Sequence, residues 1–455
     1  MSVKPGRIAA IDAFRGFTVA GMIMVNNPGG WGAIYAPLRH AEWHGCTPTD
    51  LVFPFFLFIV GMASFFSFKK FDFELTSQSF FKILKRTVLI FVIGLALAAY
   101  PFVPKSMASG GVDYSGLRIF GVLQRIALAY FLGVSICLLL KKTKTLVMAG
   151  SFLMLLFWGI LCFISPNDPY HQQNNACRNV DVVIPGEDHV YRGNWANVPL
   201  EQLIITPVSN DQVRVVAISD LALDVSYVRL SDTESYSLIR EKGAEGLQYK
   251  VVPKDETITA EDAAYKVLPE IKRARLIGLD PEGLLGVLSA AATVIFGFLV
   301  GRLISEKSKI SKSDVVLNLF LFGLPIAFLG MLWGQWFPIN KPLWTGSYVL
   351  YTGGLAMVIL AFFIWLMDVK ERGKWFKPFV EFGSNPLFLF VLAGVIAKTL
   401  SRIKIDGLGT YQWLYQNVYS HLGSHFGSLI QAITFIVVMW LIAHYLYKNK
   451  IYIKV

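Results

Sequence analysis

The chain has 455 residues, of which 54% are apolar and only 16% are charged, and its formal net charge is +11. Soluble domains carry roughly 25% charged residues, so this composition excludes an ordinary soluble globular protein. The excess of basic residues is spread over several separate loops, so it is not a nucleic-acid signal and no nucleic-acid partner is expected. Four cysteines are too few to indicate a disulfide framework.

Ten apolar stretches recur along the chain, each near the ~20 residues that a membrane-spanning helix requires. In chain order they cover about 9–27, 50–68, 84–101, 118–140, 145–165, 284–304, 314–333, 346–367, 379–400 and 426–447. The predicted fold class is therefore an all-α polytopic membrane protein with about ten transmembrane helices. The first stretch follows Lys4 and Arg7 without a small-residue cleavage site, so we expect a retained helix rather than a signal peptide.

Basic residues mark alternate connections between the predicted helices. The loops near 69–86, 141–144, 302–312, 370–377 and 448–454 are rich in Lys and Arg, whereas the intervening short loops carry few. Because positively charged loops stay on the cytoplasmic side, this pattern predicts that both termini are cytoplasmic and that the number of spans is even. A bacterial inner membrane, with membrane lipid around the helices, is the simplest location.

One connection is far longer than the others and divides the chain. Residues 1–165 hold the first five predicted helices, 166–283 form a periplasmic loop, and 284–455 hold the last five. Within the loop, about 194–275 is predicted to be a small α+β periplasmic insertion. Alternating apolar residues at 213–218, 223–230 and 248–252 favour strands, and 259–268 favours a short helix that Pro269 ends. A solvated insertion without catalytic work is the plainer interpretation.

The loop at 28–49 is the densest in groups that could carry chemistry. It holds His40 and His44, follows Asn26 and precedes Asp50. Histidine titrates near neutral pH and is the commonest general acid or base, although a loop histidine is usually only solvated. A metal site built from both histidines and a carboxylate matches no zinc spacing, so no metal is predicted. A disulfide between Cys46 and Cys177 is left open.

Charged groups inside predicted spans are costly and often functional. Asp12 and Arg15 lie three residues apart, so they share one helix face and can pair. The pair is either structural, at the cytoplasmic end, or a basic contact for an anionic ligand entering from inside. Gln124 and Arg125 lie well inside another apolar run, which is unusual.

Four further polar residues lie near helix ends, in segments that read as caps or turns: Glu282, Asn340, Lys341 and Asn385. Together with the groups inside the spans, they suggest a polar cavity within the membrane part. We therefore expect Asp12, Asp50 and these four residues to support the substrate or the site.

An ordered set of motifs resembles the heparan-α-glucosaminide N-acetyltransferase family over nearly all of the membrane part. The motifs are Asp12-Ala13-Phe14-Arg15-Gly16, Val25-Asn26, His40-Ala41-Glu42-Trp43-His44-Gly45-Cys46-Thr47-Pro48-Thr49-Asp50-Leu51-Val52-Phe53-Pro54, Gly121-Val122-Leu123-Gln124-Arg125, Asp280-Pro281-Glu282-Gly283, Pro338-Ile339-Asn340-Lys341-Pro342-Leu343-Trp344 and Gly383-Ser384-Asn385-Pro386-Leu387. The ordered set is specific, whereas any single motif is not. The chain departs from the family at His44, where a relative has Asn, and in the insertion at about 194–275.

The resemblance implies transfer of an acetyl group from cytoplasmic acetyl-CoA, as co-substrate, to an amino sugar on the periplasmic side. His40 matches the family's essential histidine and Asn26 its partner asparagine. The residue chemistry agrees, because a His can deprotonate an amine and an Asn amide can stabilise an oxyanion. We assign coenzyme contacts to Arg15, Gln124 and Arg125. Direct transfer and an acetyl-His intermediate both remain open.

Other functions compete with this one. A polar membrane cavity also suits a transporter of amino sugars or related solutes, and a carrier that acylates a cell-envelope polymer is a third alternative. Transporter sites usually involve broken helices at matching positions of two repeats, and the sequence shows no such pair. The acceptor is left open between glucosamine and a longer saccharide, and a homo-oligomer is neither required nor excluded.

Overall fold

The computed structural model describes residues 9–100, 119–164, 169–170, 283–307 and 311–453, together with the backbone of five strands between 203 and 253. The chain divides into two compact units, which are described separately. The first comprises Met1–Phe102, Ile119–Asp181 and Leu279–Val455, and the second comprises Val103–Arg118 and Val182–Gly278.

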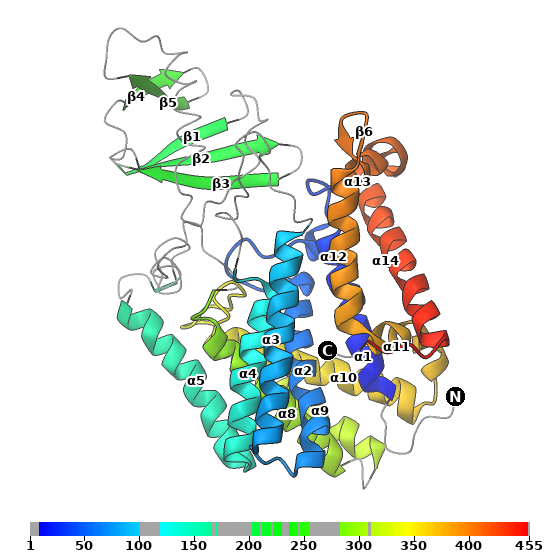
Figure 1. Ribbon diagram of the computed structural model, residues 1–455. Coiled ribbons are helices and arrows are strands. Elements are labelled where there is room, and N and C mark those ends of the chain that lie inside the picture. The colour runs from blue at the N-terminus through cyan, green and yellow to red at the C-terminus, as the bar shows by residue number, and fades with distance from the viewer. Residues whose placement is uncertain are drawn as a thin grey trace. The chain divides into compact units, whose positions relative to one another are not determined.

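The first unit is helical (Figure 1). Its helices are α1 (Ala9–Asn26), α2 (Pro48–Phe68), α3 (Ser77–Ala99), α4 (Val122–Leu140), α5 (Thr143–Ile164), α8 (Val287–Lys307), α9 (Lys312–Trp333), α10 (Gly346–Ile364), α11 (Lys377–Ser384), α12 (Pro386–Arg402), α13 (Thr410–Leu414) and α14 (Ser424–Lys448). Each of the ten predicted stretches thus contains a helix, and the boundaries differ by a few residues at most ends.

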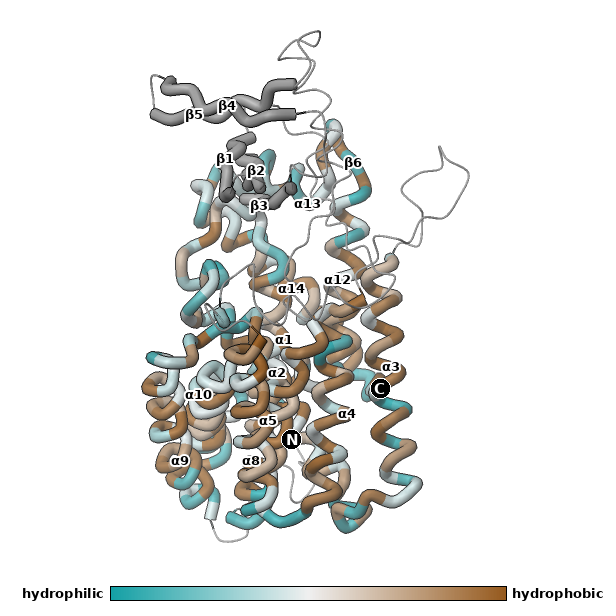
Figure 2. Tube along the Cα trace, turned by 90° about the vertical axis from the view of Figure 1, so that its left-hand side faces the viewer, coloured by the Kyte–Doolittle hydropathy of each residue, from teal (hydrophilic) through white to brown (hydrophobic). Residues whose placement is uncertain are grey.

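Within the described residues, seven helices are long and apolar enough to cross a membrane, or eight if the bent pair α11–α12 is counted as one span. Helices α1 and α3 are not among them, so the count of about ten remains a prediction. Figure 2 shows hydrophobic residues along most helices and hydrophilic ones mainly at their ends. The apolar windows of α5 and α9 are only 28% buried, so both helices present apolar faces outward, as membrane helices do.

Close backbone approach holds α2 against α8 at two glycines. A Cβ atom added to Gly61 of α2 would lie 2.0 Å from the Val294 carbonyl oxygen of α8, and one added to Gly297 of α8 would lie 1.9 Å from that of Phe58. Each helix therefore needs glycine where it crosses the other. Small residues serve this purpose in membrane bundles, where the gain comes from packing rather than from the hydrophobic effect.

The predicted ninth span is not one straight helix. Its two halves, α11 and α12, meet at Asn385 with a bend of 76°. Pro386 lacks an amide hydrogen and disfavours helical backbone at the residue before it, and Asn385 accordingly leaves the helix with φ −133° and ψ 54°. One broken helix pair is thus found in the described part of the chain, and the span predicted for 379–400 is bent where Gly383-Ser384-Asn385-Pro386 interrupts it.

The second unit contains two small antiparallel sheets (Figure 1). Strands β1 (Leu203–Ser209), β2 (Gln212–Ser219) and β3 (Ala222–Arg229) pair in that order, and β4 (Tyr236–Gly243) pairs with β5 (Gly246–Pro253). Strands β2, β3 and β5 coincide with the three stretches in which alternation predicted strands. The helix predicted at 259–268 lies outside the described residues.

Candidate functional site

The N-terminus of α2 organises the loop that precedes it. Thr47 is the N-cap residue, Pro48 is the first helical residue, and Asp50 occupies the third position, where its carboxylate accepts a hydrogen bond from the Thr47 amide. This capping box satisfies two of the amides that every helix start leaves unpaired. The motif Thr47-Pro48-Thr49-Asp50 therefore begins the helix two residues before the predicted span at 50–68 and fixes the Asp50 side chain under the loop.

Asp50 is buried, with 2% of its side chain exposed, and both carboxylate oxygens are occupied. Oδ2 accepts from the amides of Ala41 (2.9 Å) and Thr47 (3.1 Å) and from the Thr47 hydroxyl (3.1 Å). Oδ1 lies 2.6 Å from Nδ1 of His40 and 3.3 Å from Nζ of Lys341. A buried carboxylate with this many donors stays ionised and holds its neighbours in fixed positions.

The contact with Asp50 selects one tautomer of His40. When Nδ1 donates to the carboxylate, Nε2 carries the free lone pair and can act as a base or a nucleophile. Lys341 Nζ also lies 3.0 Å from Nδ1, but both atoms are donors in this tautomer, so Lys341 bonds to Asp50 instead. The His40 side chain is 48% exposed, which leaves the ring within reach of a substrate.

Asn340 holds the rest of the loop against the segment before α10. It is fully buried, its Nδ2 donates to the Trp43 carbonyl at 2.9 Å, and its Oδ1 accepts from the Leu343 amide at 2.8 Å. The same Nδ2 lies 3.4 Å from Nδ1 of His44. His44 is therefore part of this docking contact, whereas His40 pairs with Asp50. The two histidines have different surroundings although they are only four residues apart.

The structure does not join Asn26 to His40. Asn26 is the last residue of α1 and is exposed, and none of the hydrogen bonds among the described residues links its side chain to the histidine. The next residue, Asn27, is buried and donates to the Ile23 carbonyl at 2.7 Å. The role of Asn26 therefore remains a proposal.

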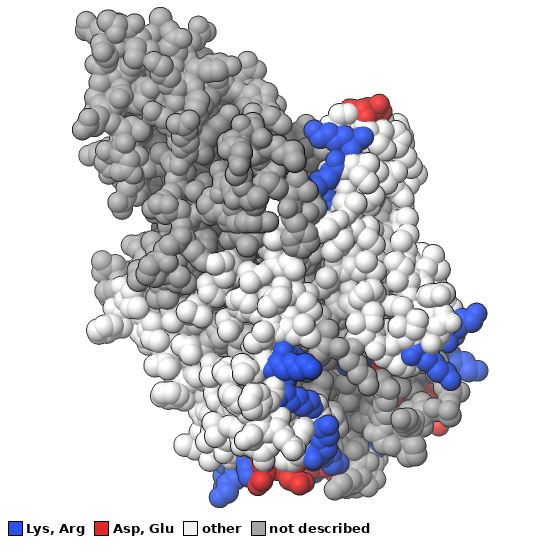
Figure 3. Space-filling model, in the orientation of Figure 1, with Lys and Arg blue, Asp and Glu red and all other residues white. Residues whose placement is uncertain are grey.

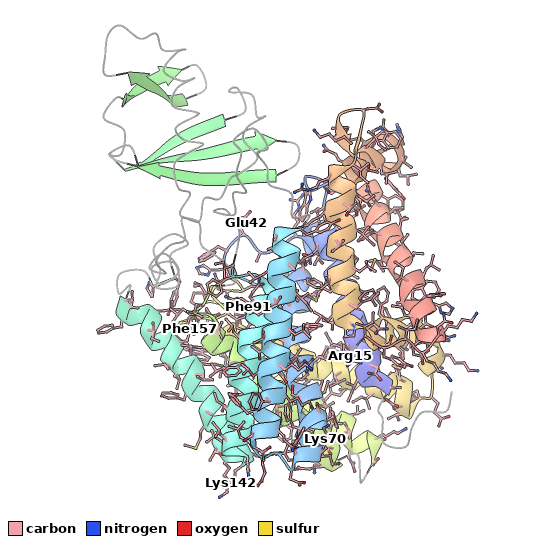
Figure 4. The ribbon with its side chains drawn as sticks, viewed as in Figure 1. Arg15, Glu42, Lys70, Phe91, Lys142 and Phe157 are labelled. Atoms are coloured by element: carbon pink, nitrogen blue, oxygen red, sulfur yellow. The ribbon has the colours of Figure 1, made fainter. Side chains whose placement is uncertain are left out.

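Arg15 joins two helices near the other end of α1. Its guanidinium donates to Oδ1 of Asp12 at 2.6 Å and to the carbonyl of Gly383, the penultimate residue of α11, at 2.8 Å. Eleven residues separate Arg15 from Asn26, about 16 Å along a helix axis. Figure 4 likewise shows Arg15 well below Glu42, which lies in the His40 loop. Arg15 therefore belongs to a different part of the bundle from His40.

Gln124 and Arg125 are each 2% exposed, near the start of α4. The Arg125 guanidinium lies 3.3 Å from the Gly283 carbonyl and 5.3 Å from the Trp344 ring centroid. Trp344 directly follows the segment that holds Asn340 and Lys341, so Arg125 packs beside the segment that contacts the His40 loop. The structure thus separates Arg15 from the other two residues assigned to the coenzyme.

Two predicted site residues remain, Asn385 and Glu282, and only Asn385 lies among the described residues. Asn385 is buried and binds the chain end, since its Nδ2 donates to the Ile451 carbonyl (2.9 Å) and its Oδ1 accepts from the Ile453 amide (2.7 Å). Glu282 and Cys177 lie outside the described residues.

Cys46, in the loop before α2, is a free thiol. Burial, followed by the negative charge of Asp50, raises the pKa of Cys46 to about 12.

Sequence reasoning missed a second histidine–carboxylate contact. Glu381 of α11 is 1% exposed and accepts from Nε1 of Trp440 at 2.8 Å, and it lies 3.1 Å from Nδ1 of His444. These residues are about 60 positions apart, so spacing offered no signal. In the described part of the chain, no group of three His, Cys, Asp or Glu side chains is arranged to hold a metal ion.

Comparison with known proteins places the site in context. Residues 7–167 match the family model of the heparan-α-glucosaminide N-acetyltransferase catalytic domain. The chain is 25% identical to the human heparan-α-glucosaminide N-acetyltransferase over 473 residues, covering 100% of this chain and 61% of that protein. It is 24% identical to the mouse protein of the same name, covering 99% of this chain and 60% of the relative. The chain is thus similar to heparan-α-glucosaminide N-acetyltransferases, it spans about 60% of the length of these two relatives, and the family-model match includes the motifs around His40 and Asp50.

Proposed function

We propose that this protein is a transmembrane N-acetyltransferase that moves an acetyl group from acetyl-CoA to the amine of an amino sugar, either glucosamine or a glucosamine-ended saccharide. The observation that carries the proposal is the 2.6 Å contact between His40 Nδ1 and the buried Asp50 carboxylate. It prepares a half-exposed imidazole whose Nε2 can accept a proton, as acetyl transfer to an amine requires. The similarity to the curated acetyltransferases supports the same reaction class.

In the direct route, His40 acts first as a base and then as an acid. Nε2 takes a proton from the acceptor amine while the amine nitrogen forms a bond to the thioester carbonyl carbon. The carbon–sulfur bond then breaks, its electron pair goes to sulfur, and the proton passes from His40 to the departing thiolate. The products are the N-acetylated sugar and free coenzyme A, and His40 is neutral again.

In the two-step route, Nε2 of His40 attacks the thioester itself and carries the acetyl group to the amine. Both routes need a free lone pair on Nε2, and both gain from Asp50, because the carboxylate stabilises the positive charge that forms on the ring. Lys341 keeps the pair electrically balanced, since its ammonium group lies 3.3 Å from the same Asp50 oxygen. We assign to Asn26 the hydrogen bond that stabilises the oxyanion formed on the thioester carbonyl oxygen.

The coenzyme contacts are assigned to Arg15, Gln124 and Arg125. Acetyl-CoA needs cations for its phosphates and a path for its pantetheine arm, and Arg15 and Arg125 supply positive charge in separate parts of the bundle. An extended coenzyme that reaches from one to the other would present its acetyl group near His40. This arrangement agrees with donor and acceptor on opposite sides of the membrane.

For sidedness, we infer that the His40 loop faces the periplasm of a bacterial inner membrane and that both termini are cytoplasmic. The labelled residues Lys70 and Lys142 lie at the end of the helical unit opposite Glu42 (Figure 4). Figure 3 shows most of the visible Lys and Arg residues on the lower half of the same unit, with a smaller group at its top. Because loops rich in Lys and Arg stay on the cytoplasmic side, this distribution supports a periplasmic His40 loop.

The test uses purified full-length protein in lipid nanodiscs with acetyl-CoA labelled in the acetyl group. With glucosamine as the acceptor, we expect labelled N-acetylglucosamine and a matching release of free thiol. The control is the His40→Ala variant at equal protein concentration. Uptake of glucosamine into proteoliposomes without any acetylation would replace the proposal with the transporter function.

A further inference from the structure

Three cationic side chains gather where α2 ends and α3 begins, away from the His40 site. Lys70 lies in the turn that follows α2, and its Nζ lies 4.9 Å from the Phe71 ring centroid. Lys82 of α3 lies over the same ring at 5.2 Å. Arg86 follows Lys82 by one helical turn, so both project from one face of α3. Figure 4 shows Lys70 at the end of the bundle opposite Glu42.

No carboxylate among the described residues forms an ion pair with these three side chains. Glu74, in the connection between α2 and α3, pairs instead with Lys141 at 2.9 Å. The hydrogen bonds of Lys82 go to the hydroxyl and carbonyl oxygens of Ser67, at 2.6 and 3.2 Å. Like charges this close repel one another, and an anion bound between them would reduce that repulsion.

Two buried polar atoms at this place also lack a hydrogen bond of good geometry. The Arg86 guanidinium carbon lies 4.9 Å from the Tyr130 ring centroid of α4, and Tyr130 is fully buried. Nε of Arg86 and the Tyr130 hydroxyl are both buried, and within the described part of the chain neither makes a hydrogen bond of good geometry, although the guanidinium and the hydroxyl lie close enough to interact with each other. Buried donors are almost always bonded, and a buried donor without a protein partner is a place where a water or an ion can bind. Here the neighbouring charges favour an anion.

We propose that Lys70, Lys82, Arg86 and Tyr130 form a binding site for a phosphate ester. A phosphate group offers several strong acceptor oxygens and up to two negative charges, enough for a guanidinium, a phenol hydroxyl and two ammonium groups. Arginine suits this ligand because its planar group can donate to two phosphate oxygens together. The ester can come from the headgroup of an anionic lipid or from a nucleotide such as coenzyme A, and only the second source rests on the proposed function.

The experiment measures binding rather than turnover, with full-length protein in nanodiscs. In the lipid arm, native mass spectrometry compares retained phosphatidylglycerol with retained phosphatidylcholine. In the nucleotide arm, calorimetry in phosphatidylcholine discs compares coenzyme A with its 3′-dephospho form. The variants are Arg86→Gln and Tyr130→Phe. The matched control is Lys85→Gln, which removes one charge from an exposed position on the same helix.

We expect Arg86→Gln to weaken binding of the phosphate probe about tenfold or more, and Tyr130→Phe to weaken it less, because it removes one hydroxyl and keeps the ring. Lys85→Gln should bind as the unsubstituted protein does. Loss of selective phosphatidylglycerol retention identifies a lipid site, and loss of the preference for coenzyme A over its dephospho form identifies a nucleotide site. Tyr130→Phe keeps the test decisive if Arg86→Gln does not fold.

Two results would overturn the proposal. One is that the unsubstituted protein retains phosphatidylglycerol and phosphatidylcholine equally and binds coenzyme A and its 3′-dephospho form equally. The other is that Lys85→Gln weakens binding of the phosphate probe as much as Tyr130→Phe and Arg86→Gln do. General surface charge would then account for the binding. An inactive protein that still retains phosphatidylglycerol selectively would contradict the acetyltransferase function and leave this site standing.

Discussion

His40 Nδ1 lies 2.6 Å from Oδ1 of Asp50, and the carboxylate that makes this contact also caps the start of α2. One side chain therefore both begins a membrane helix and orients the imidazole in the loop before it. The geometry of the candidate base depends on the same hydrogen bonds that fold the loop. This shared role explains why the site lies at a helix end, where unpaired amides can hold a buried carboxylate.

The first prediction concerns His40. His40→Ala should lower turnover by about 10²–10⁴-fold, the usual contribution of a positioned general base. Coenzyme binding should survive, because His40 is assigned to the acetyl transfer, whereas the coenzyme phosphates are assigned to Arg15 and Arg125. Steady-state kinetics and calorimetry with acetyl-CoA measure the two effects. His44→Ala is the control and should be milder, since His44 contacts Asn340 rather than Asp50. Normal turnover in His40→Ala together with an inactive His44→Ala would reverse the assignment.

Asp50→Asn should impair catalysis more than folding. The asparagine oxygen can still accept from the loop amides, but an amide group facing His40 would donate to Nδ1 and leave Nε2 protonated, which is the wrong tautomer for a base. We expect turnover to fall by about 10²-fold or more while the helical circular dichroism of the protein is retained. A variant with normal turnover would show that the Asp50 contact is structural only.

Cys46 should react slowly with alkylating reagents although it is partly exposed. Its thiol pKa is raised from 9.0 to about 12. Only the thiolate reacts, so alkylation at pH 8 should be about 10³-fold slower than for an unperturbed thiol and should rise steadily with pH. Maleimide labelling of a variant that keeps Cys46 alone measures this rate. Asp50→Asn should speed the labelling, because it removes a negative charge that opposes thiolate formation. A rate equal to that of a free thiol would contradict the burial.

Arg15→Ala separates the two roles proposed for the Asp12–Arg15 pair. If Arg15 contacts coenzyme phosphates, the variant should bind acetyl-CoA more weakly while its KM for the acceptor changes little. Asp12→Asn is the control, because it removes the carboxylate partner and keeps the cation. Should both variants lose folding yield in detergent equally while acetyl-CoA affinity holds, the pair is a structural link between α1 and α11.

Membrane topology can be tested with reporter fusions. A reporter active only in the periplasm should be active when inserted near Gly246 and silent when fused at Val455, since basic loops stay on the cytoplasmic side. Expression levels of both fusions serve as the control. The opposite pattern of activity would place the His40 loop in the cytoplasm and rule out transfer to a periplasmic acceptor.

The sequence by itself determined where the helices of the first unit lie, because an apolar run near 20 residues has few alternatives in a membrane. It also identified His40, Asp50, Asn340 and Lys341 as candidates, through ordered motifs that resemble one family. The alternation of apolar residues located strands β2, β3 and β5 for a similar reason, since side chains in a strand alternate between its two faces.

Only the tertiary structure decided which of these residues act together. Lys341 and Asp50 are 291 positions apart, and the packing of α10 against α2 brings them to 3.3 Å. The tertiary structure also places Arg15 and Arg125 in separate parts of the bundle and brings Glu381 next to His444. Hydrophobicity and local spacing act over a few turns of one helix, whereas pairing between helices depends on which faces pack, and packing is decided only by the assembled bundle.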